Sequence, residues 1–224
     1  MTSRTLAIGD IHGCDVALET LLRRLELAAD DTLVVLGDVV DRGPNTRRAV
    51  DLLIEISSAC RLVPLIGNHE VMMQQALAGN LSMRGWLSCG GAEALASYGG
   101  IVDDIPEQHH GFLETLLPYW ETPTEIFVHA GVNPGLPLLD QDSDVLRWLS
   151  TTGAEAAHIS GKRVICGHTA QETGLPRVSS GWACLDTWAY GDGWLSCLDV
   201  ERDIVYQANQ RGEYRILRLA AAQS

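Results

Sequence analysis

The sequence is poor in positive charge. Its 224 residues include 16 lysines and arginines against 29 aspartates and glutamates, which gives a formal net charge of −13. A surface that binds nucleic acid nonspecifically needs clustered lysine and arginine. The charge balance therefore predicts that nucleic acid is not a partner.

Long hydrophobic runs are also missing. The longest, such as Thr32 to Leu36, have the length of a strand and fall far short of the roughly 20 residues that a membrane span needs. The first ten residues lead directly into a strand-like run, without a basic leader, an apolar signal core or a small-residue cleavage site. We therefore expect no membrane association and a cytoplasmic location.

No pair of cysteines has the C-x-x-C spacing of a zinc or redox motif. Four of the six lie in apolar surroundings, which favours buried free thiols over disulfides or a zinc site. The six cysteines are Cys14, Cys60, Cys89, Cys166, Cys184 and Cys197.

The composition, with 46% hydrophobic and 20% charged residues, is typical of a globular domain, and we expect one domain over residues 1–224. Apolar residues in the first 80 positions alternate between strand and helix spacing, which indicates parallel strands covered by helices. The expected strands span 5–8, 33–36 and 62–66, and the expected helices span 16–28, 45–56 and 70–78.

The middle of the chain, residues 81–120, has a mostly helical pattern interrupted by paired glycines, and we interpret it as a helical insert or cap. Further strands are expected at 125–128 and 163–166. The remaining apolar runs predict β-hairpins, and they span 183–186, 194–200, 204–207 and 214–219. Together these elements predict an α/β fold, a sandwich of mixed sheets flanked by helices.

Clusters of ligand-type residues follow five of the expected strands. They are Gly9-Asp10-Ile11-His12-Gly13, Gly37-Asp38-Val39-Val40-Asp41-Arg42-Gly43, Gly67-Asn68-His69-Glu70, His129-Ala130-Gly131 and Gly167-His168. Because the carboxyl ends of strands in an α/β sheet share one edge, residues far apart in the sequence are expected to converge there.

Imidazole nitrogens together with carboxylate oxygens suit divalent manganese, iron or zinc. We assign Asp10 and His12 to one ion and Asp38 to the bridge between two ions. The second ion is assigned three ligands, Asn68, His129 and His168. Two ions about 4 Å apart can acidify a shared water to hydroxide at neutral pH. Bound cations would also supply the positive charge that an acidic protein needs to hold a phosphate.

Four residues complete a hydrolytic site. Arg42 has the planar fork that grips two phosphate oxygens, and Asn68 is a second candidate contact to the substrate. His69 is placed to protonate the departing oxygen, and Asp41 is the acid best placed to orient that imidazole. For Arg42 the alternative is an ion pair with a neighbouring aspartate.

The motifs GDIHG, GDVVDRG, GNHE, HAG and GH, in this order, resemble the signature of the PPP-type serine/threonine phosphoprotein phosphatases within the calcineurin-like metallophosphoesterases, and most closely the small bacterial branch. The resemblance spans Asp10 to His168. It implies a four-layer αββα sandwich with two mixed sheets flanked by helices, a binuclear centre with manganese expected first, and the roles given above on the same residues. It also implies a phosphoprotein or phosphopeptide substrate, carrying phosphoserine or phosphothreonine and in relatives also phosphotyrosine or small phosphoesters.

The sequence departs from this family at two positions. Relatives supply a second phosphate-gripping arginine in a stretch resembling LWxR, whereas here the arginine precedes the tryptophan, so Arg147 is only a candidate for that role. Trp188 stands where relatives commonly have glycine, and its bulk is expected to narrow the approach to His168.

Two other functions remain open. Symmetrical diadenosine tetraphosphatases share these motifs, and residues 81–120 would then hold the nucleosides. A silent metal-binding scaffold that docks phosphorylated partners is a further alternative, against which the retention of His69 and Asp41 argues. Neither the oligomeric state nor the identity of the metal follows from the sequence.

Several residues near or outside the motifs have simpler interpretations. Three histidines outside the motifs, His109, His110 and His158, are expected at the surface. Glu70 is interpreted as a carboxylate favoured at a helix start, with support of a metal ligand as the alternative.

Overall fold

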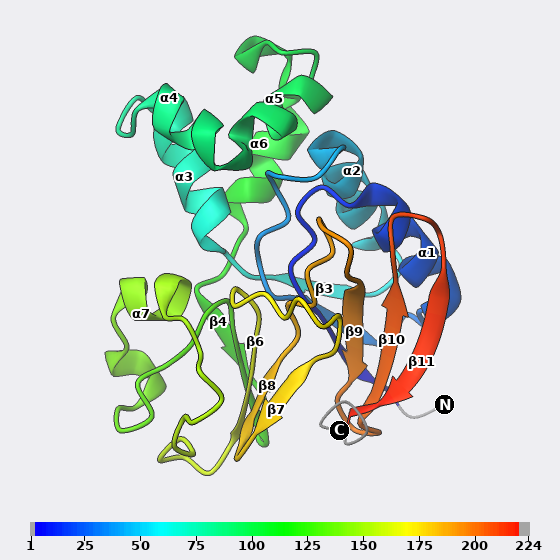
Figure 1. Cartoon of the computed structure of the whole chain (residues 1–224), viewed down its shortest axis with the longest axis vertical. Helices are drawn as coiled ribbons and strands as arrows, with labels where there is room; N and C mark the ends of the chain where they lie inside the picture. Colours follow the sequence, from blue (N-terminus) through cyan, green and yellow to red (C-terminus); the bar gives the residue numbers. More distant parts are fainter. Residues whose placement is uncertain (1–2, 220–224) are drawn as a thin grey trace.

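The structure, a computed structural model, describes residues 3–219 and contains two mixed β-sheets with helices outside them (Figure 1). The six-stranded sheet has the order β11-β10-β9-β1-β2-β3 and the five-stranded sheet the order β4-β5-β6-β8-β7. The first sheet is formed by β1 (Thr5–Ile8), β2 (Thr32–Val35), β3 (Arg61–Pro64), β9 (Leu195–Asp199), β10 (Ile204–Ala208) and β11 (Tyr214–Arg218). The second is formed by β4 (Tyr119–Glu121), β5 (Glu125–Val128), β6 (Arg163–Cys166), β7 (Arg177–Ser179) and β8 (Trp182–Cys184).

Side chains of the strands alternate between hydrophobic clusters, as the period of two in a strand requires. In β1, Leu6 and Ile8 pack in the cluster that lies with the helices, whereas Ala7 packs in the cluster between the sheets, together with Phe127 of β5. A further cluster covers the outer face of the second sheet and includes Leu146. The layer order is therefore helix, sheet, sheet, helix, and the predicted fold class is confirmed.

Helices cover the outer faces of both sheets. They are α1 (Asp15–Leu25), α2 (Thr46–Ile56), α3 (Asn68–Leu77), α4 (Met83–Trp86), α5 (Ala92–Ser97), α6 (Glu107–Glu114) and α7 (Ser143–Trp148). The start of α2 shows why the sequence folds this way. The Asn45 side chain accepts the backbone N–H of Arg48 at 3.1 Å, and Ala49 and Leu53 are buried one turn apart.

The parallel pairing of β1, β2 and β3 brings their carboxyl ends to one edge. The second sheet contributes β5 and β6, which also pair in parallel. The loops that follow these strands carry the predicted ligands, so the topology alone collects them at one edge of the sandwich.

Most predicted elements are present with ends shifted by a few residues. The expected helix over 16–28 stops at Leu25, because Glu26 adopts a left-handed φ of 45°. Residues 81–120 are largely helical as expected, except that β4 begins at Tyr119. The short strands β4 and β7 were not expected. They pair with β5 and β8, two strands that the sequence predicted.

Two of the three histidines expected at the surface are buried, which contradicts that prediction. His109 is 1% exposed, and its ring bonds the Tyr98 hydroxyl and an Asp51 oxygen, each at 2.9 Å. His158 is 4% exposed, and its ring bonds the carbonyl of Leu136. Local polar partners compensate the burial of both rings. His110 is partly exposed.

All six cysteines are free thiols, as expected, and five of them are buried. Within residues 3–219 the structure has no helix whose length and hydropathy would let it cross a bilayer. The single domain expected over residues 1–224 stays a prediction, and it includes residues 1–2 and 220–224, which lie outside the described part.

We expect Asp31→Asn to lower the free energy of unfolding by about 2 kcal/mol at pH 7. Burial raises the pKa of Asp31, but hydrogen bonds from Arg4 and Ala28 outweigh it and hold that pKa at about 2. A carboxyl whose pKa is depressed in the folded state stabilises the fold above its unfolded pKa of about 3.9. Urea unfolding should therefore show the difference between wild type and variant shrinking as the pH falls from about 4 toward 2. A difference that does not change with pH would contradict this account.

Candidate metal centre

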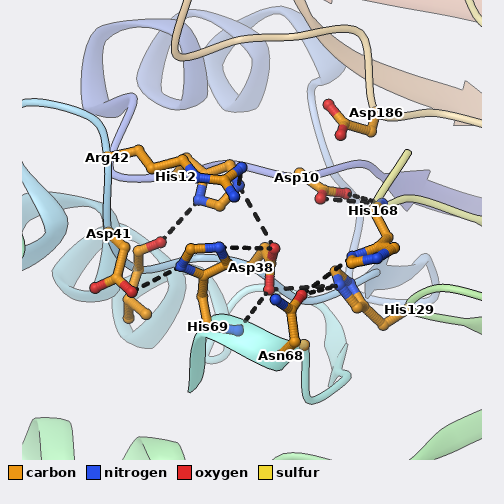
Figure 2. A network of polar contacts seen from close by, with 12 residues as sticks. Asp10, His12, Asp38, Asp41, Arg42, Asn68, His69, His129, His168 and Asp186 are labelled. Atoms are coloured by element: carbon orange, nitrogen blue, oxygen red, sulfur yellow. Dashed lines mark hydrogen bonds and ion pairs between the residues drawn. The ribbon is translucent and has the colours of Figure 1, made fainter. Parts of the chain in front are cut away.

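The predicted ligands converge at the shared strand edge, as Figure 2 shows. Asp38 lies at the centre, 1% exposed, on the loop that follows β2. Its φ of 48° is left-handed, and so are those of His12 and His168. Several non-glycine residues in a sparsely populated conformation at one place indicate backbone strain held by the surrounding fold, which is typical of functional sites.

Two groups of ligand atoms share Asp38. One group is His12, Asp38 and His69, the other is Asp38, His129 and His168, and the ligand atoms of each lie within 4.8 Å of one another. The bridging position expected for Asp38 thus agrees with the geometry. Its Oδ2 lies 3.5 Å from His12 Nε2, and its Oδ1 lies 3.4 Å from His129 Nε2.

Backbone carbonyls around the site set the tautomers of His12 and His129. His12 Nδ1 donates to the carbonyl of Val40 at 2.9 Å, and His129 Nδ1 donates to the carbonyl of Leu36 at 2.9 Å. Each Nε2 therefore keeps its lone pair. That of His12 accepts from Arg42 Nη1 at 3.0 Å, and that of His129 faces the Asp38 carboxylate. A lone pair facing a carboxylate oxygen is unfavourable unless a cation lies between them.

The second group includes an amide oxygen. Asn68 Oδ1 lies 3.0 Å from His129 Nε2 and 3.1 Å from His168 Nδ1. The other side of the His168 ring interacts with the backbone of Trp148. The structure therefore brings together Asn68, His129, His168 and Asp38, the four residues predicted around the second ion.

Asp10, predicted to bind the first ion, belongs to neither group. Its carboxylate oxygens accept the backbone N–H of His168 at 3.0 and 3.1 Å, and a Cβ at Gly167 would lie 2.0 Å from Oδ1. Burial raises the pKa of Asp10 well above its usual range, and the negative charges of Asp186 and Asp38 add to this effect. A ligand role for Asp10 stays a prediction.

Asp186, on the loop after β8, is a site residue that the sequence reasoning missed. It is 1% exposed, and burial raises its pKa to about 6. Its Oδ1 accepts the backbone N–H of Trp188 at 3.1 Å, while its Oδ2 has no hydrogen-bond partner among residues 3–219. Its position at the end of the expected strand 183–186 was the available signal, since the other ligands also follow strands.

The residues present fit a pair of divalent cations. Burial lowers the pKa of His129 to about 3 and that of His168 to about 4, so both rings are neutral at pH 7 and can bind metal. Burial also raises the pKa of Asp38 to about 6, and bound cations would stabilise its charged form. The nitrogen and oxygen donors suit manganese, iron or zinc without selecting one.

The two residues of the predicted acid pair are in contact, and His69 is also a member of the first group. His69 Nδ1 lies 2.7 Å from Asp41 Oδ2, and the Trp86 indole N–H also donates to Asp41, at 3.0 Å. Burial raises the pKa of Asp41 to about 7, and burial lowers the pKa of His69. The short contact lets the Asp41 carboxyl orient the His69 imidazole, as the predicted roles of the two residues require. Trp86 was missed, since nothing in the helical pattern marks it.

Arg42 lies over the first group rather than in an ion pair with Asp38 or Asp41, the alternative for this residue. Its Nη1 donates to His12 Nε2 at 3.0 Å, and its Cζ lies 4.8 Å from the centre of the Tyr190 ring. Its backbone N–H donates to the carbonyl of Gly90 at 2.9 Å, so the helical region 81–120 helps to hold it. The guanidinium therefore borders the ligand cluster, where phosphate oxygens can reach it.

Arg147, the candidate second arginine, lies on the side of the second group. Burial is the largest cause that lowers the pKa of His129, and the positive charge of Arg147 adds a smaller effect. The Nε of Arg147 is buried and lacks a hydrogen-bond partner within the described chain. A buried cationic donor without a partner suits an anionic ligand. The phosphate-binding role of Arg147 stays a prediction. Next to it, the ring of Trp148 lies 6.4 Å from that of His168.

Glu70 does more than begin a helix. Its carboxylate accepts the backbone N–H of Gly67 at 2.8 Å, as a helix-start carboxylate would. It also accepts the N–H groups of Asp38, Val39 and Val40 at 2.9, 2.7 and 3.1 Å. Glu70 thereby fixes the loop that carries Asp38, the supporting role that was the alternative.

The family model of the calcineurin-like phosphoesterases matches residues 3–172, about three quarters of the chain. The chain belongs to the calcineurin-like phosphoesterases. The buried ligand groups around Asp38 agree with a binuclear metal site of the kind typical of that superfamily.

Curated relatives of this calcineurin-like phosphoesterase include symmetrical bis(5'-nucleosyl)-tetraphosphatases. The protein of that name from Acidovorax ebreus (strain TPSY) is 41% identical over 73 residues, which cover 32% of this chain and 25% of the relative. The chain thus spans about a quarter of the length of the curated relatives that it matches.

Solved structures share the fold over nearly the whole chain. A candidate diadenosine tetraphosphatase superposes with a TM-score of 0.68 and 22% identity, covering 97% of this chain and 94% of its own. A cold-active protein tyrosine phosphatase superposes with a TM-score of 0.69 and 15% identity, covering 99% of this chain and 80% of its own. At these identities the likeness extends to the fold alone.

Proposed function

We propose that this phosphoesterase hydrolyses dinucleoside polyphosphates such as diadenosine tetraphosphate. The observation that carries the proposal is the 41% identity over 73 residues to an enzyme named for that activity. The sequence motifs alone favoured a phosphoprotein phosphatase, which we now place second.

Two arginines at the metal centre support a substrate with several phosphates. Arg42 borders the His12 group, and the charges of Arg42 and Arg147 both contribute to lowering the pKa of His129 after burial. Each guanidinium can grip the oxygens of a phosphate by paired hydrogen bonds. Two such contacts suit a chain of phosphates in a protein whose overall charge is −13.

The chain's own residues supply the remaining steps of hydrolysis. When two divalent ions are bound, they provide positive charge at the phosphoryl oxygens and acidify a water to hydroxide at neutral pH. Arg42 orients the phosphoryl group and stabilises the charge that develops on its oxygens. His69, held by Asp41, donates its proton to the leaving oxygen.

A phosphoprotein phosphatase is the second candidate, and it is supported by the order of the motifs. A silent scaffold is less consistent with the site, because the His69–Asp41 pair has the geometry of a working acid.

The experiment compares diadenosine tetraphosphate with phosphoserine and phosphotyrosine peptides, using the purified protein after analysis of its bound metal and with added Mn²⁺. We expect kcat/KM for the dinucleotide to exceed that for either peptide at least about tenfold. Cleavage in ¹⁸O-labelled water identifies the phosphorus that is attacked. A preference for a peptide would reverse the order of the two candidates.

A further inference from the structure

A closed loop, residues 186–194, carries two aromatic side chains toward the metal centre. It connects β8 to β9 and projects beyond the strand ends (Figure 1). The backbone N–H groups of Gly191 and Gly193 donate to the carbonyl of Trp188 at 3.0 and 3.2 Å, and Trp194 N–H donates to the carbonyl of Thr187 at 2.9 Å. These internal hydrogen bonds give the loop one defined shape.

Trp188 has an unfavourable backbone conformation in this loop. Its φ is 63°, in the left-handed region that bulky residues rarely adopt. A Cβ at Gly191 would lie 2.3 Å from Cε2 of the indole, so the glycine backbone covers the ring closely. The ring is nevertheless only half-buried. A strained backbone that holds a large, partly exposed ring in place suggests a functional use for the ring.

Tyr190 joins this indole to the catalytic residues. Its ring stands at 82° to that of Trp188, with the centres 6.4 Å apart. It also stands edge-on to His12, 4.9 Å away, and 4.8 Å from the guanidinium of Arg42. The aromatic pair therefore begins next to Arg42 and continues to Trp188. The narrowing of the approach to His168 by Trp188 stays a prediction.

We propose that Trp188 is a stacking platform for a nucleobase of the substrate, with Tyr190 holding the platform next to Arg42. Naming a nucleobase rests on the proposed function, since the phosphate chain would begin at the metal centre and Arg42, and the base would reach the loop. Stacking does not depend on positive charge, so it can add affinity in a protein with few lysines and arginines. Trp188 would then distinguish nucleotides from phosphates without a base.

The test measures whether the base contributes to binding. The probes are adenosine 5′-(α,β-methylene)diphosphate and methylenediphosphonate, which share a phosphorus backbone that the enzyme does not cleave. Calorimetric titration of the full Mn²⁺-loaded chain should show the nucleotide binding about tenfold more tightly, which corresponds to about 1.4 kcal/mol. In Trp188→Gly this ratio should fall toward one. Glycine adopts the left-handed φ freely, so the backbone of the loop is not put at risk.

Trp120→Leu is the matched control. Trp120 is also a half-buried indole beside an arginine, Arg61, whose Cζ lies 5.5 Å from its ring, but it lies on β4, away from the ligand groups. The affinity ratio should stay at the wild-type value in this variant. The affinity for methylenediphosphonate reports whether the metal and arginine site is intact in each protein.

An unchanged ratio in Trp188→Gly, or a wild-type ratio near one, would overturn the stacking proposal. This outcome is distinct from failure of the proposed function, which is judged by hydrolysis. The protein could prefer a phosphopeptide substrate while Trp188→Gly still lowers the affinity ratio. The stacking proposal would then stand, and only the proposed substrate would be wrong.

Discussion

Replacing His69 with asparagine is expected to lower kcat by about 10²–10⁴-fold while two metal ions stay bound. The ring donates the proton to the leaving oxygen, and asparagine cannot supply one. Asparagine preserves the backbone N–H of residue 69, which donates to Asp38 Oδ1 at 3.1 Å, so the central carboxylate keeps this contact. Steady-state kinetics on diadenosine tetraphosphate, together with metal analysis of the purified variant, make the measurement.

Metal content is essential to this test, because His69 Nε2 lies 4.0 Å from Asp38 Oδ2 and belongs to one of the two ligand groups. If the variant loses one ion, His69 is a ligand and its role as the acid is wrong. If both ions stay and kcat is unchanged, His69 has no part in the chemistry. The loss should be larger with a phosphoserine peptide, whose alkoxide leaving group requires a proton, than with 4-nitrophenyl phosphate, whose leaving group needs none.

His109→Asn provides the matched control. His109 is likewise buried and lies 2.9 Å from an aspartate, Asp51, but it belongs to α6 in the helical region, outside the ligand groups. The variant removes an equivalent imidazole from an equivalent pair. A comparable fall in kcat in both variants would indicate a general loss of structure rather than loss of an acid.

The ligand loops could be predicted because each of them repeats one local arrangement. A short apolar strand ends, in four of the five cases at a glycine, and ligand-type residues follow at once, as in Gly9-Asp10 after β1. Parallel pairing then requires these ends to share an edge, so Asp38, His129 and His168 could be placed together without any knowledge of side-chain contacts.

The residues that support the ligands could not be predicted, because their contacts cross between elements. Trp86 bonds Asp41 from a helix that begins more than forty positions later in the chain. Glu70 collects three N–H groups from the Asp38 loop, which its own neighbours in the sequence do not reveal. The burial of His109 and His158 likewise depends on partners in other segments.

The preference for a substrate was the part of the function that the motifs could not determine. Metal ligands, the acid pair and Arg42 act on the phosphoryl group, which phosphopeptides and dinucleotides share. Discrimination depends on surfaces such as Trp188 and Arg147, where this chain departs from the pattern that it resembles. A departure from a pattern marks a position of interest but does not say what binds there.

Asp38→Asn should remove at least one of the two metal ions and lower kcat/KM by at least about 100-fold. Asp38 is the residue common to both ligand groups, with one oxygen toward His12 and the other toward His129. An amide has a single acceptor oxygen and no charge, so it cannot serve both sides. The loss of one carboxylate charge from a buried site also weakens the attraction for any cation.

Asparagine is the informative replacement because of the backbone. Asp38 has a φ of 48°, and asparagine tolerates the left-handed region better than other non-glycine residues, so the loop should keep its path. Asp199→Asn is the control, since Asp199 is also fully buried but is held by Arg202, at 2.8 Å, at the end of β9. Metal analysis and Mn²⁺ titration should separate the two variants. If Asp38→Asn retained two ions and the wild-type kcat/KM, the carboxylate would not bridge them.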